Sequence, residues 1–329
     1  MLHPTTWAEW RGMYTNLDLW TPIIKEILKH EGISFNHISV SKHPGTHAVF
    51  QIDDSYILKI YTPLAPNDFP IEASIYNSLA HSDKAHLFPL VIGQGEIDCP
   101  SLWNYLIITM ISGSPYREIE PLMTKDEKVQ MSKKLGTTIK KYHSVLCNNV
   151  QLSKWPLEPN QQRVKKELLE ISQLSDKIID KVIAFLNDDR PSHQSPLVTV
   201  HADVTEDHVF LTRKDQQWVM TGLIDVADSK RSISLLEFPA IWFELFKGDK
   251  EMMQAFLNTY DSNILWNEET RMSFIYMTLV HQFGIDMLQL VLKRKKITSV
   301  HTLEELFELM WPQSLFMNQS DSAISKEHI

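Results

Sequence analysis

The chain has 329 residues, of which 43% are hydrophobic and 22% charged, and its formal net charge is −9 at pH 7. This length favours two lobes or domains, and the composition is ordinary for a soluble globular enzyme. The acidic balance argues against nucleic acid as a partner.

The two cysteines, Cys99 and Cys147, predict no disulfide framework and suit a reducing cytoplasm. Residues 1–20 contain polar and charged side chains throughout, so they do not read as a signal peptide. The longest apolar stretch near the middle of the chain, Tyr105 to Ile111, is too short to cross a bilayer. We therefore expect a cytoplasmic protein without a membrane partner.

Strand signals dominate residues 1–112. Two β-rich runs are joined by Asp53, Asp54 and Ser55, which suit the tight turn of a hairpin. In chain order, the sequence predicts strands over 46–53 and 56–61, a short helix over 69–80, and strands over 88–97 and 103–111. These elements predict a small β-rich lobe.

Helical periodicity takes over after the turn-forming residues 112–115. The first predicted helix, 124–146, starts at Thr124 with Glu127 three positions on, the signature of a capping box. Further helices are predicted near residues 160–188, 234–247, 249–260, 268–292 and 302–311. Residues 113–312 are therefore expected to form a large helical lobe, and residues 313–329 a polar tail that frays. The predicted fold class is α+β with two lobes.

Residues 197–225 interrupt these helices and carry the strongest functional signal. Asp203 and Asp225 each follow a β-like run, and the polar stretch 213–217 between them suits a hairpin turn. If the two flanking runs pair, the chain returns on itself and brings Asp225 close to Asp203 and His208. A base and a pair of metal ligands would then share one pocket, as phosphoryl transfer needs.

The polar residues of this segment have different expected roles. Asp203 could accept a proton from a substrate hydroxyl and orient it. Asp225 would be the main divalent-metal ligand, because Mg²⁺ prefers hard oxygen donors. Asp228 could be a second metal contact, or equally a solvated or helix-capping residue. Glu206 and Asp207 are expected to be exposed turn residues.

Lys59 lies inside the apolar run 56–61, where a charge is costly to bury unless something pairs with it. Glu72, at the start of the following helix, is a candidate partner, and nucleotide phosphates are another. The alternative is a lysine whose stem lies on the sheet while its ammonium reaches water. The preceding turn, with Gly45 and Thr46, could offer N–H groups and a hydroxyl to phosphates, or could be an ordinary turn.

Taken together, these motifs resemble the aminoglycoside phosphotransferase/choline kinase family, which has the two-lobed protein-kinase-like fold. The matching segments, in chain order, are Gly45 to Ile52, Lys59, Glu72, Tyr105 to Pro115, Leu135 to His143, His201 to Leu211 and Gly222 to Asp228. Within the family, the chain is most similar to the hygromycin B phosphotransferase branch. That similarity covers the helix Leu19 to Gly32, the segment Leu235 to Phe256 and the tail Leu303 to Pro312.

The resemblance implies roles for individual residues. Asp203 would be the catalytic aspartate and Asp225 the metal-binding aspartate. Lys59 would contact the α- and β-phosphates, and Glu72 would hold it. The hinge that hydrogen-bonds the purine would be formed by Met110, Ile111 and Ser112. His143 is expected to be a buried, satisfied histidine beneath the catalytic loop.

The chain departs from the family pattern at His208, which stands where the metal-binding asparagine is usual. A neutral imidazole can ligate a divalent ion but suits Mg²⁺ less well than an amide oxygen. Ala202 replaces the arginine that follows histidine in protein kinases, and Val226 and Ala227 replace their Phe-Gly. A protein kinase with a phosphorylation-switched activation loop is therefore disfavoured.

The sequence thus predicts a small-molecule kinase that transfers the γ-phosphate of ATP or GTP to a hydroxyl of an aminoglycoside- or aminocyclitol-like acceptor. Its cofactor would be Mg²⁺, held by Asp225 and His208, and its partners a nucleoside triphosphate and a small hydroxyl compound. The acceptor should lie between the helices of 124–188 and the C-terminal helices. Candidate acceptor-binding residues there are Asp228, Glu237, Glu244 and Asp286. We expect a monomer or weak homodimer, with a resistance or housekeeping role.

Two alternatives remain open from the sequence. One is a catalytically weak, nucleotide-binding family member, for which His208 is the only argument. The other is a metal-dependent phosphohydrolase with four metal ligands, namely His201, Asp203, His208 and Asp225. It would leave Lys59, Glu72 and the β-rich lobe without a role.

Overall fold

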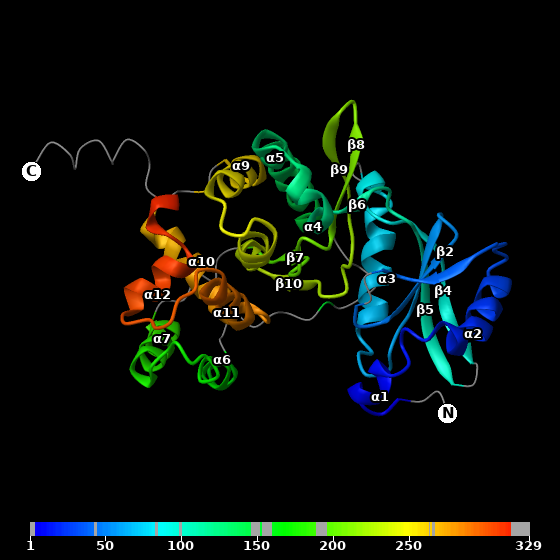
Figure 1. Cartoon of the computed structure of the whole chain (residues 1–329), viewed down its shortest axis with the longest axis horizontal. Helices are drawn as coiled ribbons and strands as arrows, with labels where there is room; N and C mark the ends of the chain where they lie inside the picture. Colours follow the sequence, from blue (N-terminus) through cyan, green and yellow to red (C-terminus); the bar gives the residue numbers. More distant parts are fainter. Residues whose placement is uncertain are drawn as a thin grey trace, which may run out of the picture.

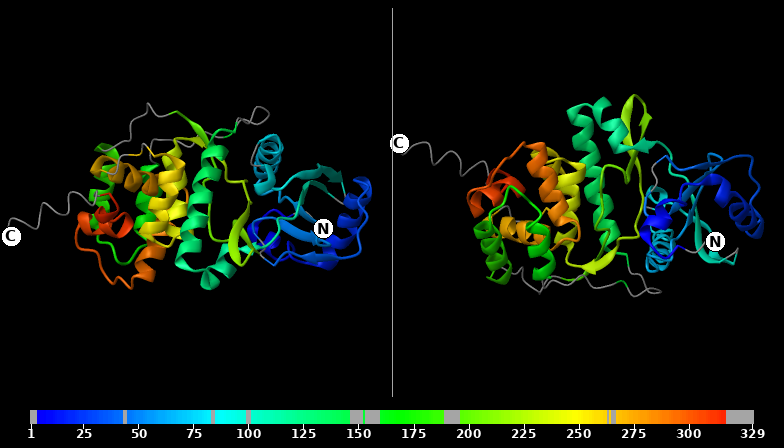
Figure 2. Two further views of the ribbon diagram at one scale, coloured as in Figure 1. Left: turned by 90° about the horizontal axis from the view of Figure 1, so that it is seen from above. Right: turned by 60° about the horizontal axis from the view of Figure 1, so that its bottom comes forward.

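The structure is a computed structural model of the chain. It describes residues 4–42, 45–82, 85–98, 101–145, 152, 160–188, 196–262, 264 and 267–316. Cys99, Cys147 and residues 317–329 lie outside this part of the chain. A β-rich lobe at one end is followed by a larger, mainly helical lobe (Figure 1), and the views in Figure 2 show the same two-part arrangement. The predicted two-lobed α+β fold is confirmed, whereas its boundaries at residues 112 and 312 stay predictions.

The first lobe is built on one antiparallel sheet with strand order β1-β2-β3-β5-β4. Its strands are β1 (Ile38–Val40), β2 (Ala48–Ile52), β3 (Tyr56–Ile60), β4 (Val91–Asp98) and β5 (Leu102–Thr109). The two predicted strand pairs, β2 with β3 and β4 with β5, are confirmed. The short edge strand β1 was not predicted. Asp53, in the β2–β3 turn, has a positive φ of 47° and accepts hydrogen bonds from two backbone N–H groups, those of Asn36 and His37.

The two faces of this sheet are covered by different helices. These are α1 (Trp7–Arg11) and α2 (Leu17–His30) on one side and α3 (Asp68–Leu79) on the other. Strand β5 shows the alternation of a two-sided strand, because Trp103 and Ile107 share the cluster of α1 and α2, whereas Leu106 and Ile108 share that of α3. The rings of Trp20 and Trp103 meet edge to face with centroids 5.0 Å apart.

The predicted hairpin in the second lobe is formed by β8 (Val209–Lys214) and β9 (Gln217–Leu223), which join β6 (Ser114–Pro115) in a small sheet. Asp215 and Gln216 form its two-residue turn, with φ values of 48° and 67°, as a twisted hairpin requires. The run before Asp203, β7 (Val198–Val200), pairs instead with β10 (Lys230–Ser232).

The rest of this lobe consists mainly of helices. They are α4 (Tyr116–Ile119), α5 (Lys125–His143), α6 (Gln161–Leu168), α7 (Asp176–Asp188), α8 (Phe238–Ala240), α9 (Lys250–Tyr260), α10 (Glu268–Val280), α11 (Gly284–Arg294) and α12 (Leu303–Met310). The capping box predicted at Thr124 and Glu127 is present at the start of α5. Short 3₁₀ and π turns flank α8, so the predicted helix over 234–247 is not one regular helix.

Two predicted helices are divided in the structure. The helix predicted over 160–188 is α6 and α7, and α7 starts where the Ser175 carbonyl accepts the N–H of Ile179. The helix predicted over 268–292 is α10 and α11, which are bent by 106°. The bend brings Gly284 so close to the Thr278 carbonyl that a Cβ at residue 284 would lie 1.7 Å from its oxygen. Such a contact over six residues is invisible to helical periodicity.

Among the described residues, no single helix is long and apolar enough to span a membrane, and only the sharply bent pair α10 and α11 reaches that length and composition together.

The frayed tail predicted from residue 313 is wrong at its start. Leu315 and Phe316 are buried, and the Phe316 ring packs against Phe274 and Trp311, because these apolar side chains complete the core.

Gly136 lets α5 approach α9, because a Cβ at residue 136 would lie 2.4 Å from the Phe256 carbonyl oxygen. In a free helix, alanine is more stable than glycine by about 1 kcal/mol. Here we expect the contact to outweigh that gain, so that Gly136→Ala lowers the free energy of unfolding by about 1–3 kcal/mol. Urea unfolding measures this. Gly12→Ala, with its nearest neighbour at 3.4 Å, should stay within about 0.5 kcal/mol. Stabilisation by Gly136→Ala would contradict the close packing.

Candidate active site

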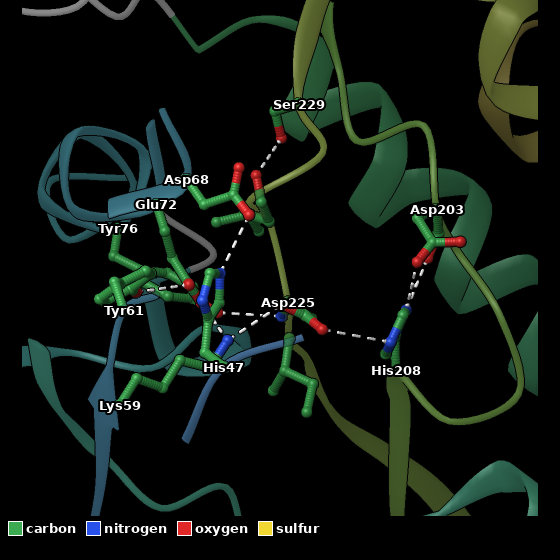
Figure 3. A network of polar contacts seen from close by, with 12 residues as sticks. His47, Lys59, Tyr61, Asp68, Glu72, Tyr76, Asp203, His208, Asp225 and Ser229 are labelled. Atoms are coloured by element: carbon green, nitrogen blue, oxygen red, sulfur yellow. Dashed lines mark hydrogen bonds and ion pairs between the residues drawn. The ribbon is translucent and has the colours of Figure 1, made fainter. Parts of the chain in front are cut away.

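A cleft of about 700 Å³ lies between the lobes. Its walls come from both of them, and they include Thr46, Lys59, Tyr76, Met110, His208 and Asp225. The predicted residues around Lys59 and the catalytic hairpin therefore meet in one place (Figure 3).

Lys59, on β3, is buried and lies between two carboxylates. Its Nζ is 2.7 Å from Glu72 Oε1 on α3 and 2.9 Å from Asp225 Oδ1 at the end of β9. Burial would lower the pKa of Lys59, but Asp225 and Glu72 outweigh it and raise that pKa above its usual value. The predicted Lys59–Glu72 ion pair is thus present, and the alternative of an ammonium that reaches water is wrong. Contact with nucleotide phosphates stays a prediction.

Asp225 is held on three sides. Its Oδ1 accepts from Lys59, its Oδ2 is 3.5 Å from His208 Nε2, and its backbone N–H donates to the Tyr76 hydroxyl at 3.0 Å. Burial would raise the pKa of Asp225, but Lys59 and His208 hold it well below its usual value. Asp225 therefore stays ionised, as a metal ligand must be.

His208 lies between the two aspartates (Figure 3). Its Nδ1 is 2.6 Å from the backbone carbonyl of Asp203, so Nδ1 is assigned as the donor. In the neutral imidazole, the lone pair on Nε2 then faces Asp225. Burial opposes protonation, yet the charges of Asp225 and Asp203 raise the pKa of His208 above its usual value.

Asp203 follows β7 and faces this group. Burial raises its pKa to about 7, neighbouring carboxylates led by Asp228 add to the shift, and His208 opposes it. A carboxylate with a pKa near neutrality is suited to accept a proton at physiological pH.

The catalytic loop rests on a buried glutamate. Glu237 accepts the backbone N–H of His201 at 2.7 Å and that of Ala202, which has a positive φ of 64°, at 3.1 Å. His143 lies 3.0 Å from Glu237 and 2.8 Å from the Tyr260 hydroxyl, so its predicted role as a buried, satisfied histidine is confirmed. The acceptor contact predicted for Glu237 is wrong, because this side chain is fully buried beneath the loop.

The other acceptor candidates lie in different surroundings. Asp228 lines the cleft and accepts from Gln282 Nε2 at 2.7 Å. Glu244 is half-buried, and burial raises its pKa, with Arg294 opposing the shift. Asp286 is exposed on α11 and is not among the residues that line the cleft.

Glu206 and Asp207 are not simple exposed turn residues. Glu206 is buried, 2.7 Å from Lys247 Nζ and 3.2 Å from an Arg117 guanidinium nitrogen. Asp207 accepts two hydrogen bonds from Arg117, and both of these side chains line the cleft. A salt bridge across 90 residues leaves no local pattern, so the sequence did not indicate it.

The hinge and the loop before β2 also reach the cleft. Gly45, Thr46, Met110 and Ile111 line it, whereas Ser112 is not among the lining residues. The Met110 N–H donates to the Ser55 carbonyl at 2.8 Å, and the Ser112 carbonyl accepts from Thr221. The Met110 N–H and one lone pair of the Ser112 carbonyl therefore have partners within the chain. Hydrogen bonding of the purine by the 110–112 segment stays a prediction. The Thr46 carbonyl accepts the Trp10 indole N–H at 2.7 Å.

A divalent ion would find two facing donors here. In the part of the chain described, no group of three or more His, Cys, Asp or Glu side chains could hold a metal. His208 Nε2 and Asp225 Oδ2 do face each other at 3.5 Å. This pair fits an ion that takes its remaining ligands from phosphates and water, the usual arrangement for Mg²⁺ at nucleotide sites.

Two tyrosines that the sequence analysis did not single out complete the site. The Tyr61 hydroxyl donates to Glu72 Oε2 at 2.6 Å, and the Tyr76 hydroxyl accepts from Asp225. Glu72 and Tyr76 are four residues apart on α3 and so share one face of the helix. That spacing was the one available signal.

Comparison with known proteins identifies a family and similar folds. The model of a family described as "APH: Phosphotransferase enzyme family" matches residues 43–271. The fold is similar to the GDP complex of wild-type aminoglycoside 2'-phosphotransferase-IIIa, with TM-score 0.64 and 11% identity over 93% of this chain and 99% of that one. It is also similar to spectinomycin phosphotransferase, APH(9)-Ia, in complex with ADP and spectinomycin, with TM-score 0.55 and 14% identity over 94% and 98% of the two chains. A third likeness is to amicoumacin kinase hAmiN with AMP-PNP and Ca²⁺, with TM-score 0.58 and 13% identity over 93% and 96%.

Glu237 provides a direct test of the loop support. Glu237→Ala removes the acceptor of two backbone N–H groups and the partner of His143. We expect the free energy of unfolding to fall by about 3–5 kcal/mol, because the removal of one member of a buried polar network strands the others. Urea unfolding measures this change. The exposed Asp286 serves as the control, and Asp286→Ala should cost less than about 1 kcal/mol. Equal losses in the two variants would contradict the assignment.

Proposed function

The chain belongs to the phosphotransferase enzyme family, and from this premise we propose that it transfers the γ-phosphate of ATP or GTP to a hydroxyl of a small acceptor. The observation that carries the proposal is the position of Lys59, whose ammonium joins Glu72 of the first lobe to Asp225 of the second inside the cleft. A buried cation at this place can bind phosphate oxygens when a nucleotide enters. Both guanine and adenine nucleotides occur in similar structures, so the proposal keeps both donors.

Asp225 and His208 would hold the divalent ion, for which Mg²⁺ is our proposal. When bound, such an ion neutralises charge on the β- and γ-phosphates. The support is the facing pair of Asp225 Oδ2 and His208 Nε2, with Asp225 kept ionised by Lys59. Imidazole is a better ligand for Mn²⁺ than for Mg²⁺, so we expect Mn²⁺ to replace Mg²⁺ readily.

Asp203 would orient the acceptor hydroxyl and accept its proton as the oxygen attacks phosphorus. Its raised pKa, near 7, suits a base that must pick up a proton and release it at neutral pH. Lys59 would hold the phosphates on the other side of the cleft, and the hydroxyl would approach from the side of Asp228.

For the acceptor we propose an aminoglycoside- or aminocyclitol-like compound. Carboxylates gather near Asp203, namely Asp228, Asp225 and Glu244, and each adds to its pKa shift. Such a field favours an acceptor with amino groups. The similar solved structures are named for spectinomycin and amicoumacin, and resistance to such a compound would be one role. A nucleoside triphosphate donor fits the cytoplasmic location that we propose.

Asp203→Asn keeps the shape of the side chain and removes the base. We expect kcat to fall by about 10²–10⁴-fold, the usual contribution of a positioned base. Release of ADP or GDP is measured with a panel of hydroxyl compounds, and nucleotide affinity is measured by calorimetry. Asp286→Asn, outside the cleft lining, should keep both properties. Full turnover by Asp203→Asn would remove Asp203 from this role, and nucleotide binding without turnover in the unmutated chain would favour the weak-binder alternative.

The raised pKa of Asp203, about 7, sets the pH dependence. The base must be ionised, so below pH 7 the ionised fraction and kcat/KM should fall, by up to about tenfold per pH unit. Because Asp203 and His208 titrate as a pair, the midpoint of the kcat/KM profile reports on both groups together. Because His208 lowers the pKa of Asp203, the midpoint should move to higher pH in His208→Asn. A profile that stays flat between pH 5.5 and 8 in a chain that remains folded would contradict the prediction.

A further inference from the structure

Asp225 has a backbone conformation that is unfavourable by itself. Its φ is +64°, in the left-handed region where residues other than glycine are uncommon. Such a conformation persists when the surroundings fix it, and it is found most often at functional sites. Two groups of the first lobe contact this residue, Lys59 through Oδ1 and Tyr76 through the backbone N–H.

Tyr76 is placed to fix the backbone rather than the carboxylate. It lies on α3, one turn after Glu72, it is fully buried, and it is among the residues that enclose the cleft. Its hydroxyl oxygen is 3.0 Å from the Asp225 nitrogen (Figure 3). Burial and the charge of Glu72 raise the pKa of Tyr76 well above its usual value, so the phenol stays neutral.

The contact determines where the carboxylate points. With the N–H held by Tyr76, Asp225 directs Oδ1 to Lys59 and Oδ2 to His208. Glu72 and Tyr76 stand on the same face of α3, so one helix orients both Lys59 and Asp225. Without the phenol oxygen, the N–H loses this acceptor and the left-handed backbone loses one of its two fixed points.

We infer that Tyr76 is a positioning residue for the metal-binding carboxylate: its phenol oxygen holds the backbone of Asp225 so that Oδ2 faces His208. This inference rests on the proposed function, because it assumes that a divalent ion and a nucleotide bind in the cleft. Groups that orient a metal ligand without touching the metal typically contribute 10–100-fold to metal affinity. Tyr76 should therefore contribute to metal-dependent nucleotide binding and not to metal-free binding.

The experiment measures the affinity of AMP-PNP by calorimetry with and without Mn²⁺ in the full chain. The ratio of the two dissociation constants is the metal enhancement. In Tyr76→Phe, we expect this enhancement to fall by about 10–100-fold while the metal-free affinity is unchanged. A general loss of packing would weaken both affinities together.

Tyr105→Phe is the matched control. It also removes a phenol hydrogen bond in the first lobe, the partly buried one of Tyr105 to Glu31 Oε1 at 2.6 Å, on the other face of the sheet. It should keep the wild-type enhancement. Wild-type enhancement in Tyr76→Phe, or an equal loss in both variants, would overturn the inference and leave the proposed function standing.

Two further outcomes are distinguishable. If the unmutated chain binds no nucleotide, the proposed function fails and the inference with it; if it binds nucleotide without metal enhancement, only the metal-dependent part fails, and the inference is overturned. If Tyr76→Phe does not fold, 3,5-difluorotyrosine at residue 76 keeps the shape and weakens the oxygen as an acceptor. A loss of metal enhancement in the difluorotyrosine protein, smaller than the loss expected for Tyr76→Phe, would support the role of Tyr76. Wild-type enhancement in the difluorotyrosine protein would overturn it.

Discussion

The site depends on one buried cation. Lys59 comes from the sheet of the first lobe, yet its ammonium neutralises carboxylates of both lobes, Glu72 on α3 and Asp225 after β9. A buried ammonium without such partners would be strongly unfavourable, and so would the buried carboxylate of Glu72 without the ammonium. The lobes therefore contact each other through the ion pair of Lys59 and Asp225 as well as through apolar packing. The cleft between them already contains an ammonium group that can bind phosphate oxygens.

The second lobe supports its functional residues from beneath. Ala202 and Asp225 both have positive φ values, and the backbone N–H of each donates a hydrogen bond, that of Ala202 to the Glu237 carboxylate and that of Asp225 to the Tyr76 hydroxyl. The side chains of Asp203 and Asp225 both face His208, which lies between them, and Asp225 and His208 line the cleft. Burial raises the pKa of both aspartates. In Asp225 the charges of Lys59 and His208 outweigh burial and lower the pKa, whereas in Asp203 the opposing effect of His208 does not outweigh burial and the neighbouring carboxylates.

The sequence predicted the parts of this site that have local signals. The polar turn between β8 and β9, the capping box at Thr124 and the charge inside β3 each follow from a few neighbouring residues, and the structure contains all three. What it missed depends on contacts between distant segments. Nothing near Glu237 shows that it is buried under the loop at residue 202, and nothing near Gly284 shows that the Thr278 carbonyl will press against it.

A crystal structure with AMP-PNP and Mn²⁺ would test the proposed site most directly. We expect anomalous density for Mn²⁺ in contact with both Asp225 Oδ2 and His208 Nε2, with Lys59 bonded to the phosphates and still to Glu72. An ion bound by the nucleotide and Asp225 alone, with His208 turned away, would contradict the assignment of His208. A nucleotide bound outside the cleft would contradict the proposed function.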